Sequence, residues 1–249
     1  MPSLGSHLVR ARAVAERLAL PEIDRERGAF YLGATAPDIR VITRNDREVT
    51  HFFRLADFGD QDSVARMFEE HPHLATQSDL DAVTTAFIAG YLTHLVLDET
   101  FIREIYRPYF GALSDLGSDP RANVLDRALQ YEIDRRDRED REALDEIGAS
   151  LDGVTPVGGI PFIEDSALVE WLRVSQDVAS QAADYSRFQR MLTRHLKDAG
   201  YDEDAIAREC EQPLELVAEA FRVVPEARLA RFATDADEAM TLRVKDYLR

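Results

Sequence analysis

The stretch AFIAGYLTHLVLDE, residues 86–99, combines an apolar helix pattern with two residues that could carry chemistry. His94 and Asp98 are four residues apart, so both side chains project from the same face of a helix. An unpaired carboxylate in an apolar interior is costly, so Asp98 needs compensation. A divalent cation provides it, because imidazole and carboxylate are both good ligands for zinc and related metals. For the pair taken alone, a His–Asp hydrogen bond is the simpler interpretation.

Three further residues of the same chemistry lie on or beside apolar sequence, namely His7, Asp38 and His51. His7 falls on the apolar side of an amphipathic helix pattern. Asp38 follows a proline in a predicted turn, where aspartate commonly caps its own backbone. His51 begins the apolar segment HFFRL. Each is unremarkable alone, but together with His94 and Asp98 they predict a buried His/Asp metal site.

The elements that would position these residues are helices. Helical periodicity dominates and no useful β-type alternation occurs, so we predict an all-α multi-helix bundle. Helices are predicted over residues 4–19, 62–70, 78–107, 121–147, 165–182, 184–199, 203–223 and 226–248, with 28–40 as a short helix or extended piece running into a turn.

Two boundary predictions bear on the site. Ser78 is the expected N-cap of the helix that carries His94 and Asp98, and that helix should end before Pro108. The Gly- and Pro-rich segment 149–162 is the expected loop between a metal-binding core, residues 1–148, and C-terminal helices, residues 163–249, that pack on the same domain.

Composition limits the partners and the location. The formal net charge of -17 disfavours tight nucleic-acid binding, because a field of that sign repels polyanions. No apolar run approaches the roughly 20 residues that a membrane span needs, and residues 1–20 lack a signal-peptide pattern. Cys210 is the single cysteine, which excludes an internal disulfide framework and suits the cytoplasm. The oligomeric state is left open.

The segments FYLGATAPDI, Thr50-His51 and AFIAGYLTHLVLD resemble the zinc-dependent phospholipase C family, whose fold is shared with single-strand-specific zinc nucleases. The family order is a helix-borne His, an Asp after a Pro-rich turn, a His, and a G-Y-x-x-H-x-x-x-D helix. The match covers about residues 1–110. The resemblance implies a bundle of that type with extra C-terminal helices.

The same resemblance implies a ligand set. Asp38, His51, His94 and Asp98 would hold one metal, and Asp98 would bridge to a second metal that His7 also binds. In the family, the amine and carbonyl of the N-terminal residue complete that second site. Zinc is the expected metal, as two or three ions, with iron or manganese as alternatives.

The chain departs from the family at the third metal. Glu104 stands where the family has a histidine six residues after the bridging aspartate, and no histidine lies between His94 and His195. A carboxylate-rich third site from Glu104, Glu132 and Asp134 would favour a harder metal than zinc. Loss of the third metal is the equal alternative.

The function expected from this set is metal-dependent hydrolysis of a phosphoester, either a phospholipid headgroup, a small phosphodiester or a phosphomonoester. Asp38 and Asp98 are the expected catalytic residues, with Asp38 orienting the attacking water. Arg40, with Arg44 and Arg47 close behind it, is a candidate for binding phosphate. Two alternatives stay open: other hydrolytic or lyase chemistry on the same scaffold, and a non-catalytic interaction role in which the metals are structural.

Overall fold

The protein is described by a computed structural model that covers residues 1–249 except 118, 155–156, 182–184 and 199, and excludes the side chains of 185–188 and 198. The regular structure of these described residues is helical, with no strand among them, which confirms the all-α class. The longer helices are α1 (Leu4–Leu18), α3 (Arg27–Thr35), α6 (Ser63–Glu70), α7 (Ala82–Phe101), α8 (Pro120–Asp137), α9 (Arg141–Asp152), α10 (Asp165–Ser180), α11 (Tyr185–Asp198), α12 (Glu203–Glu211), α13 (Pro213–Val223) and α14 (Glu226–Tyr247). Short elements connect them: α2 (Pro21–Arg25), η1 (Ala36–Ile39), α4 (Arg40–Thr43), α5 (Arg47–His51), η2 (Pro72–Leu74), η3 (Gln77–Asp79) and the π-helix η4 (Ile102–Phe110).

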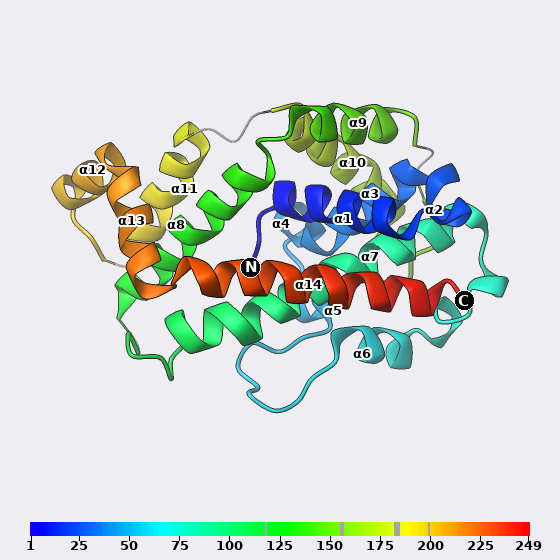
Figure 1. Ribbon diagram of the computed structural model, residues 1–249, viewed down its shortest axis with the longest axis horizontal. Coiled ribbons are helices and arrows are strands. Elements are labelled where there is room, and N and C mark those ends of the chain that lie inside the picture. Colours follow the sequence, from blue (N-terminus) through cyan, green and yellow to red (C-terminus); the bar gives the residue numbers. More distant parts are fainter. Residues whose placement is uncertain (118, 155–156, 182–184, 199) are drawn as a thin grey trace.

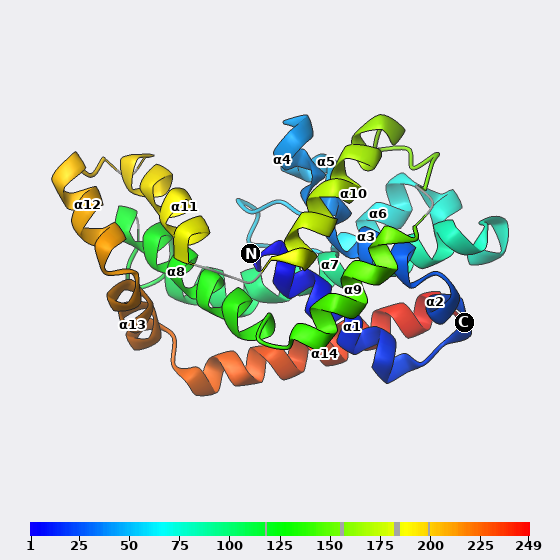
Figure 2. The same cartoon turned by 90° about the horizontal axis from the view of Figure 1, so that it is seen from above.

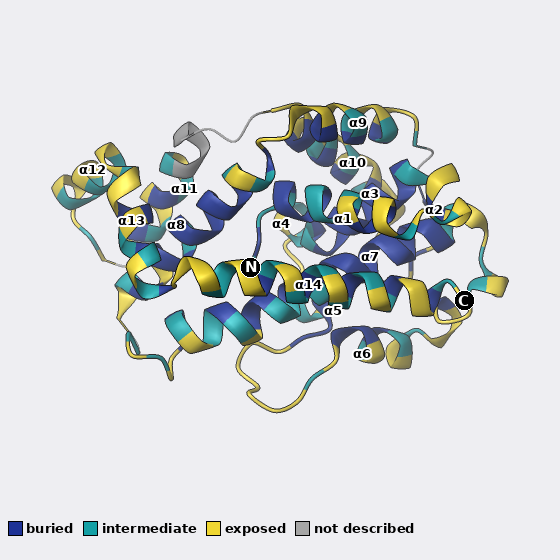
Figure 3. Cartoon of the chain, viewed as in Figure 1, coloured by how far each residue is buried: buried dark blue, intermediate teal, exposed yellow. Residues whose placement is uncertain are grey.

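Helix α7 forms the centre of the bundle. It packs against α1, α3, α6 and α14, and most of its residues are buried, as the dark blue ribbon in Figure 3 shows. In Figure 1, α1 and α3 are drawn on one side of α7 and the long α14 on the other, whereas Figure 2 shows α1 between α7 and α14. A helix that is apolar around its whole circumference is expected in such a central position.

Two glycines allow α3 and α7 to approach closely. A Cβ atom added to Gly33 would overlap the backbone carbonyl of Phe87, and one added to Gly90 would overlap that of Phe30. Because the obstructing atoms are backbone atoms, no rotamer change could relieve the overlap. This crossing brings the carbonyl of Ala34 to the ring of His94.

The ends of α7 differ from the sequence prediction. Asp81, not Ser78, caps the helix, with its side chain accepting a hydrogen bond from the backbone of Thr84 at 2.7 Å. The helical path also does not stop before Pro108, but widens into η4, where the amide of Gly111 bonds to the carbonyl of Tyr106. Pro108, which has no N–H group to donate, lies within this π-helical segment.

Other predicted helices are divided. The single helix expected over residues 121–147 is two, because Asp140 caps a new helix, α9, by accepting from the amide of Ala143. The helix expected over 203–223 breaks before Pro213, between α12 and α13. The predicted loop begins only at residue 153, since α9 extends through Asp152. The segment predicted over 28–40 is α3 followed by η1.

The helices after residue 163 pack on the earlier ones in two places. Helices α10 and α14 lie against α1, with α10 also on α9 and α14 on α7. Helices α11 and α13 pack on α8 at one end of the molecule, away from the C-terminus (Figure 2). Among the described helices, none has both the length and the apolar character to cross a membrane.

Candidate metal centre

Five side chains predicted from the sequence meet at one point in the interior, although they come from four separate elements. His7 belongs to α1, Asp38 to η1, His51 to α5, and His94 and Asp98 to α7. The ring nitrogen Nε2 of His7 lies 3.4 Å from Oδ1 of Asp98. The Nε2 atoms of His51 and His94 lie 3.5 and 3.7 Å from the other carboxylate oxygen, Oδ2. Oδ1 of Asp38 lies 3.4 Å from Nε2 of His51.

Most of these atoms are buried without a hydrogen-bond partner. The Nε2 atoms of all three histidines and Oδ1 of Asp98 are enclosed by protein and make no hydrogen bond among the described residues. His7, His51, His94 and Asp98 are 0–3% exposed, so solvent cannot satisfy them. Buried polar atoms are normally paired, and the convergence of these unpaired atoms forms a group that could hold a metal ion.

The orientation of His94 is set by its other nitrogen. Nδ1 lies 2.8 Å from the carbonyl oxygen of Ala34, and because a carbonyl can only accept, Nδ1 must donate. In the neutral ring, Nε2 therefore offers its lone pair to the cluster. A histidine held through its second nitrogen by a backbone carbonyl is the common arrangement around protein-bound metals.

The protonation states of the five cluster residues bear on whether they can bind a metal. Burial, followed by the charge of His94, lowers the pKa of His7 to about 4. Burial also lowers the pKa of His51. Although burial opposes it, His94 and His7 hold the pKa of Asp98 well below its ordinary value. The nearby His51 and the charge of His94 similarly keep the pKa of Asp38 low against the effect of burial. Although burial opposes it, the charge of Asp98 raises the pKa of His94. The carboxylates are therefore ionised and His7 and His51 are neutral at neutral pH, whereas a proton on His94 must leave before its Nε2 atom can bind a metal.

Three of the separations between donor atoms are close to those of a tetrahedral site. A tetrahedron with metal–ligand bonds of about 2.1 Å has edges of about 3.4 Å. The contacts Asp38–His51, His51–Asp98 and His94–Asp98 run from 3.4 to 3.7 Å. Two groups of candidate ligands share His94, namely His7–His94–Asp98 and Asp38–His51–His94. Since Nδ1 of His94 is already bonded to Ala34, only its Nε2 is free, so His94 can complete one of the two groups.

Arg47 also reaches the cluster. Its Nη2 donates to Oδ2 of Asp98 at 2.9 Å, and its side chain is only 11% exposed. Arg47 lies one turn before His51 on α5, and the hydroxyl of Tyr91 holds α5 against α7 by donating to the carbonyl of Thr50. The i,i+4 spacing of Arg47 and His51 is visible in the sequence, and it was the available sign that this arginine shares a face with a ligand.

Arg40, the predicted phosphate-binding residue, is half-buried at the start of α4, with an enclosed Nε atom that has no hydrogen-bond partner among the described residues. Arg44 ends α4 in the left-handed conformation, with φ of 63°. Of the three arginines that follow Asp38, Arg47 is the one whose contact with the cluster is observed.

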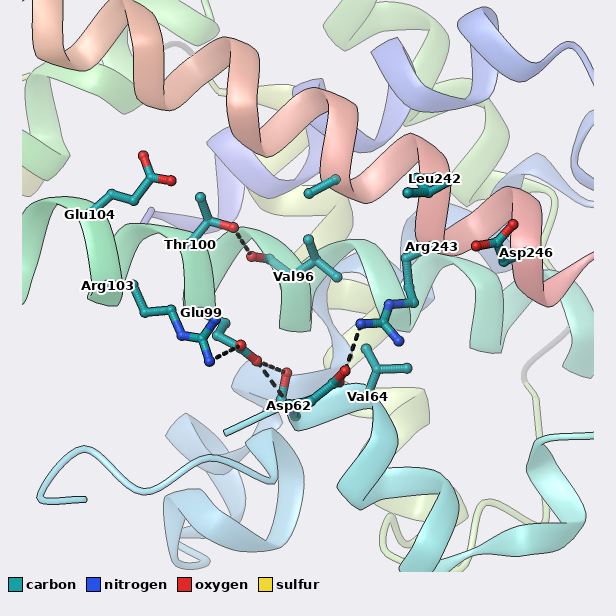
Figure 4. Close-up of a pocket in the computed structure, with 12 residues that line it drawn as sticks. Asp62, Val64, Val96, Glu99, Thr100, Arg103, Glu104, Leu242, Arg243 and Asp246 are labelled. Carbon is teal, nitrogen blue, oxygen red and sulfur yellow. Dashed lines mark hydrogen bonds and ion pairs between the residues drawn. The ribbon is translucent and has the colours of Figure 1, made fainter. Parts of the chain in front are cut away.

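Glu104, proposed for a third metal, belongs to η4, directly after the central helix α7. It lines a cavity of about 500 Å³ between α6, α7 and α14, and its carboxylate accepts from Arg228 at 2.9 Å. Figure 4 shows this cavity, in which Asp62 pairs with Arg243 and Glu99 with Arg103. None of the five cluster residues lines it.

The other two carboxylates considered for a third metal also have structural partners. Glu132 binds Arg135 and Arg136, each at 2.8 Å. Asp134 accepts from the amide of Ser6 and from Arg138, and so holds the start of α1 on α8.

Helix α8 carries a buried carboxylate that the sequence reasoning missed. Asp126 is 3% exposed, accepts from Gln130 through Oδ2 at 2.7 Å, and has no hydrogen-bond partner for Oδ1 among the described residues. Burial lowers the pKa of the Met1 α-amine to about 6, while the charges of Asp126 and Asp98 act in the opposite direction. The amine is therefore within electrostatic reach of the cluster.

Comparison with known proteins assigns the chain to no family. No family model, curated protein or solved structure matches the chain. The resemblance to zinc-dependent phospholipases C rests on the five residues and their order, and it stays a prediction.

Proposed function

We propose that the protein is a metal-dependent hydrolase of phosphoesters. The observation that carries the proposal is the convergence of buried, unpartnered donor atoms from His7, His51, His94 and Asp98, with Asp38 beside them. Nitrogen and carboxylate donors of this kind suit zinc, and iron or manganese are the alternatives. A bound divalent ion would lower the pKa of a coordinated water and polarise a phosphoryl group.

The residues of the chain have separate roles in this proposal. Asp38 is the most accessible of the five, with its side chain 21% exposed, so it is placed to accept a hydrogen bond from the attacking water and orient it. Asp98 uses both carboxylate oxygens, one toward His7 and the other toward His51 and His94. His94 is fixed by Ala34 and acts only as a ligand. The expected substrates are a phosphomonoester, a small phosphodiester or a phospholipid headgroup.

A structural metal is the second candidate. Four protein ligands around one ion form a closed site, which is the arrangement typical of structural zinc. Asp38, His51, His94 and Asp98 would supply four such ligands. In the hydrolase, an open coordination position would come from a second ion on the His7 side of Asp98. Metal binding without turnover of any phosphoester would favour the structural role.

The test compares histidine variants. His94→Ala removes a ligand and should reduce bound metal to less than about one tenth and abolish hydrolysis of p-nitrophenyl phosphate and bis-p-nitrophenyl phosphate. His73→Ala is the matched control, because His73 is an exposed histidine outside the cluster. Metal content is measured by inductively coupled plasma mass spectrometry. His94→Ala protein with full metal content and full activity would contradict the proposal.

A further inference from the structure

Arg47 is mostly buried, and one edge of its guanidinium group faces only a weak hydrogen-bond acceptor. The Nη1 atom donates to the carbonyl of Phe53 at 3.3 Å, and Nη2 donates to Asp98 at 2.9 Å. Nε and Nη2 both also face the sulfur of Met1, at 3.1 and 2.7 Å. The Nε–Nη2 edge of a guanidinium carries two parallel N–H groups, the geometry that binds phosphate or carboxylate bidentately. Here a thioether, which is a weak acceptor, covers that edge.

A bound metal would change the charge balance around Arg47. Asp98 is the ion-pair partner of Arg47 among the described residues. The cluster has two carboxylates, Asp38 and Asp98, and a single divalent ion bound with neutral imidazoles would neutralise both. The positive charge of Arg47 would then lack compensation, and its side chain is only 11% exposed. A buried cation in that position requires an anion.

The position of Arg47 determines what that anion can touch. Nη2 lies within 2.9 Å of the carboxylate oxygen that also faces His51 and His94. An anion on the Nε–Nη2 edge would therefore lie next to the metal ligands. The covering group is the side chain of Met1, which is flexible and forms no strong hydrogen bond, so displacing it costs little.

We propose that the Nε–Nη2 edge of Arg47 binds the phosphoryl oxygens of the substrate and of the phosphate product, displacing the side chain of Met1. This inference rests on the proposed function, and it assigns to Arg47 the role that the sequence had suggested for Arg40. A tetrahedral phosphoryl group has enough oxygens to occupy the arginine edge and the metal side together. A carboxylate has only two oxygens. If Arg47 binds both of them, the carboxylate has no oxygen left for the metal.

The experiment measures binding of inorganic phosphate to the metal-loaded protein by isothermal titration calorimetry, after metal content has been determined. Arg47→Ala should weaken phosphate binding by about tenfold or more, the effect expected from loss of a charge-assisted bidentate pair. Metal content should not change. Arg54→Ala is the matched control, because Arg54 is an exposed arginine that pairs with the exposed Glu48, and it should leave phosphate affinity at the wild-type level. Equal phosphate affinity in Arg47→Ala and wild-type protein, at equal metal content, would overturn the inference.

A second variant separates the loss of phosphate binding from any effect that Arg47→Ala has on metal binding. Arg47→Lys keeps a positive charge near Asp98 but lacks the paired N–H edge. At wild-type metal content it should still weaken phosphate binding, and unchanged affinity would contradict the edge as the binding feature. Failure of the hydrolase proposal gives a different result: phosphate binds in an Arg47-dependent manner, but no phosphoester is turned over.

Discussion

His94 illustrates how a single residue is fixed for a role before any ligand arrives. Its Nδ1–H group is bonded to the carbonyl of Ala34, so its Nε2 atom is aimed at Asp38, His51 and Asp98. His7 stacks on it, with ring centroids 3.7 Å apart and an angle of 7° between the planes. Two parallel imidazoles cannot both be protonated at this distance without strong repulsion. The charge of His94 accordingly contributes, after burial, to the lowered pKa of His7.

Glu132 provides a test of the third site at the residue level. Although burial opposes it, hydrogen bonds from Arg135 and Arg136 lower the pKa of Glu132. A depressed folded-state pKa contributes stability above the unfolded value, and that contribution is lost as the pH falls through the folded value. Glu132→Gln should therefore destabilise the protein at pH 7, with the difference from wild type shrinking below about pH 4. Urea unfolding at several pH values measures this.

The same variant reports on metal binding. If Glu132 serves only its two arginines, metal content is unchanged in Glu132→Gln. Loss of one metal equivalent would instead mean that Glu132 is a metal ligand.

The sequence predicted the five cluster residues because each combines a ligand type with an apolar neighbourhood. It did not single out Arg47, because three arginines follow Asp38 within ten residues and no helix was predicted over residues 47–51, so the i,i+4 relation of Arg47 to His51 was not used. The inward position of Arg47 depends on how α5 lies against α7, where Tyr91 bonds to the carbonyl of Thr50. Asp126 was missed for a related reason: its helix is rich in acidic residues, and only packing distinguishes the buried one.

At the level of elements, the crossing of α3 and α7 controls the geometry of the site. Gly90→Ala should destabilise the protein by about 1–3 kcal/mol or more, because the new methyl group would overlap the backbone of Phe30. It should also lower metal content by moving His94 away from Ala34. The control is Gly148→Ala, since a Cβ atom there meets nothing within 4 Å and α9 should gain about 0.5–1 kcal/mol of helix propensity. Thermal unfolding and metal analysis distinguish the two variants, and equal stability would refute the role of the crossing.

Helix boundaries were the weaker part of the sequence prediction, and the reasons are local. Asp81 and Asp140 are good N-caps, but Ser78 and the continuous polar pattern of 131–147 compete with them as signals. The continuation of α7 through Pro108 depends on a π-turn that periodicity does not indicate. The helical type of the long elements other than α3, which was left as a helix or an extended piece, was predicted correctly, since apolar faces such as those of α1, α6 and α14 repeat with a helical period.

For the whole molecule, the cluster connects segments far apart in the chain. A ligand that holds α1, η1, α5 and α7 together binds the folded state alone, so it stabilises the protein by mass action. Removing metal with a chelator should therefore lower the melting temperature by about 5–10 °C. The melting temperature of His94→Ala should not respond to the chelator. An identical response of both proteins would mean that the stabilising ion binds elsewhere.

The most direct test of the account is the metal content of tag-free protein purified without chelators, measured by inductively coupled plasma mass spectrometry. The account predicts about one to two equivalents of zinc, iron or manganese per chain, from the two groups of candidate ligands, His7–His94–Asp98 and Asp38–His51–His94. Less than about half an equivalent, unchanged after incubation with these metals and dialysis, would contradict it. His94 and Asp98 would then be an internal hydrogen-bonded pair, and the hydrolase proposal would lose its support.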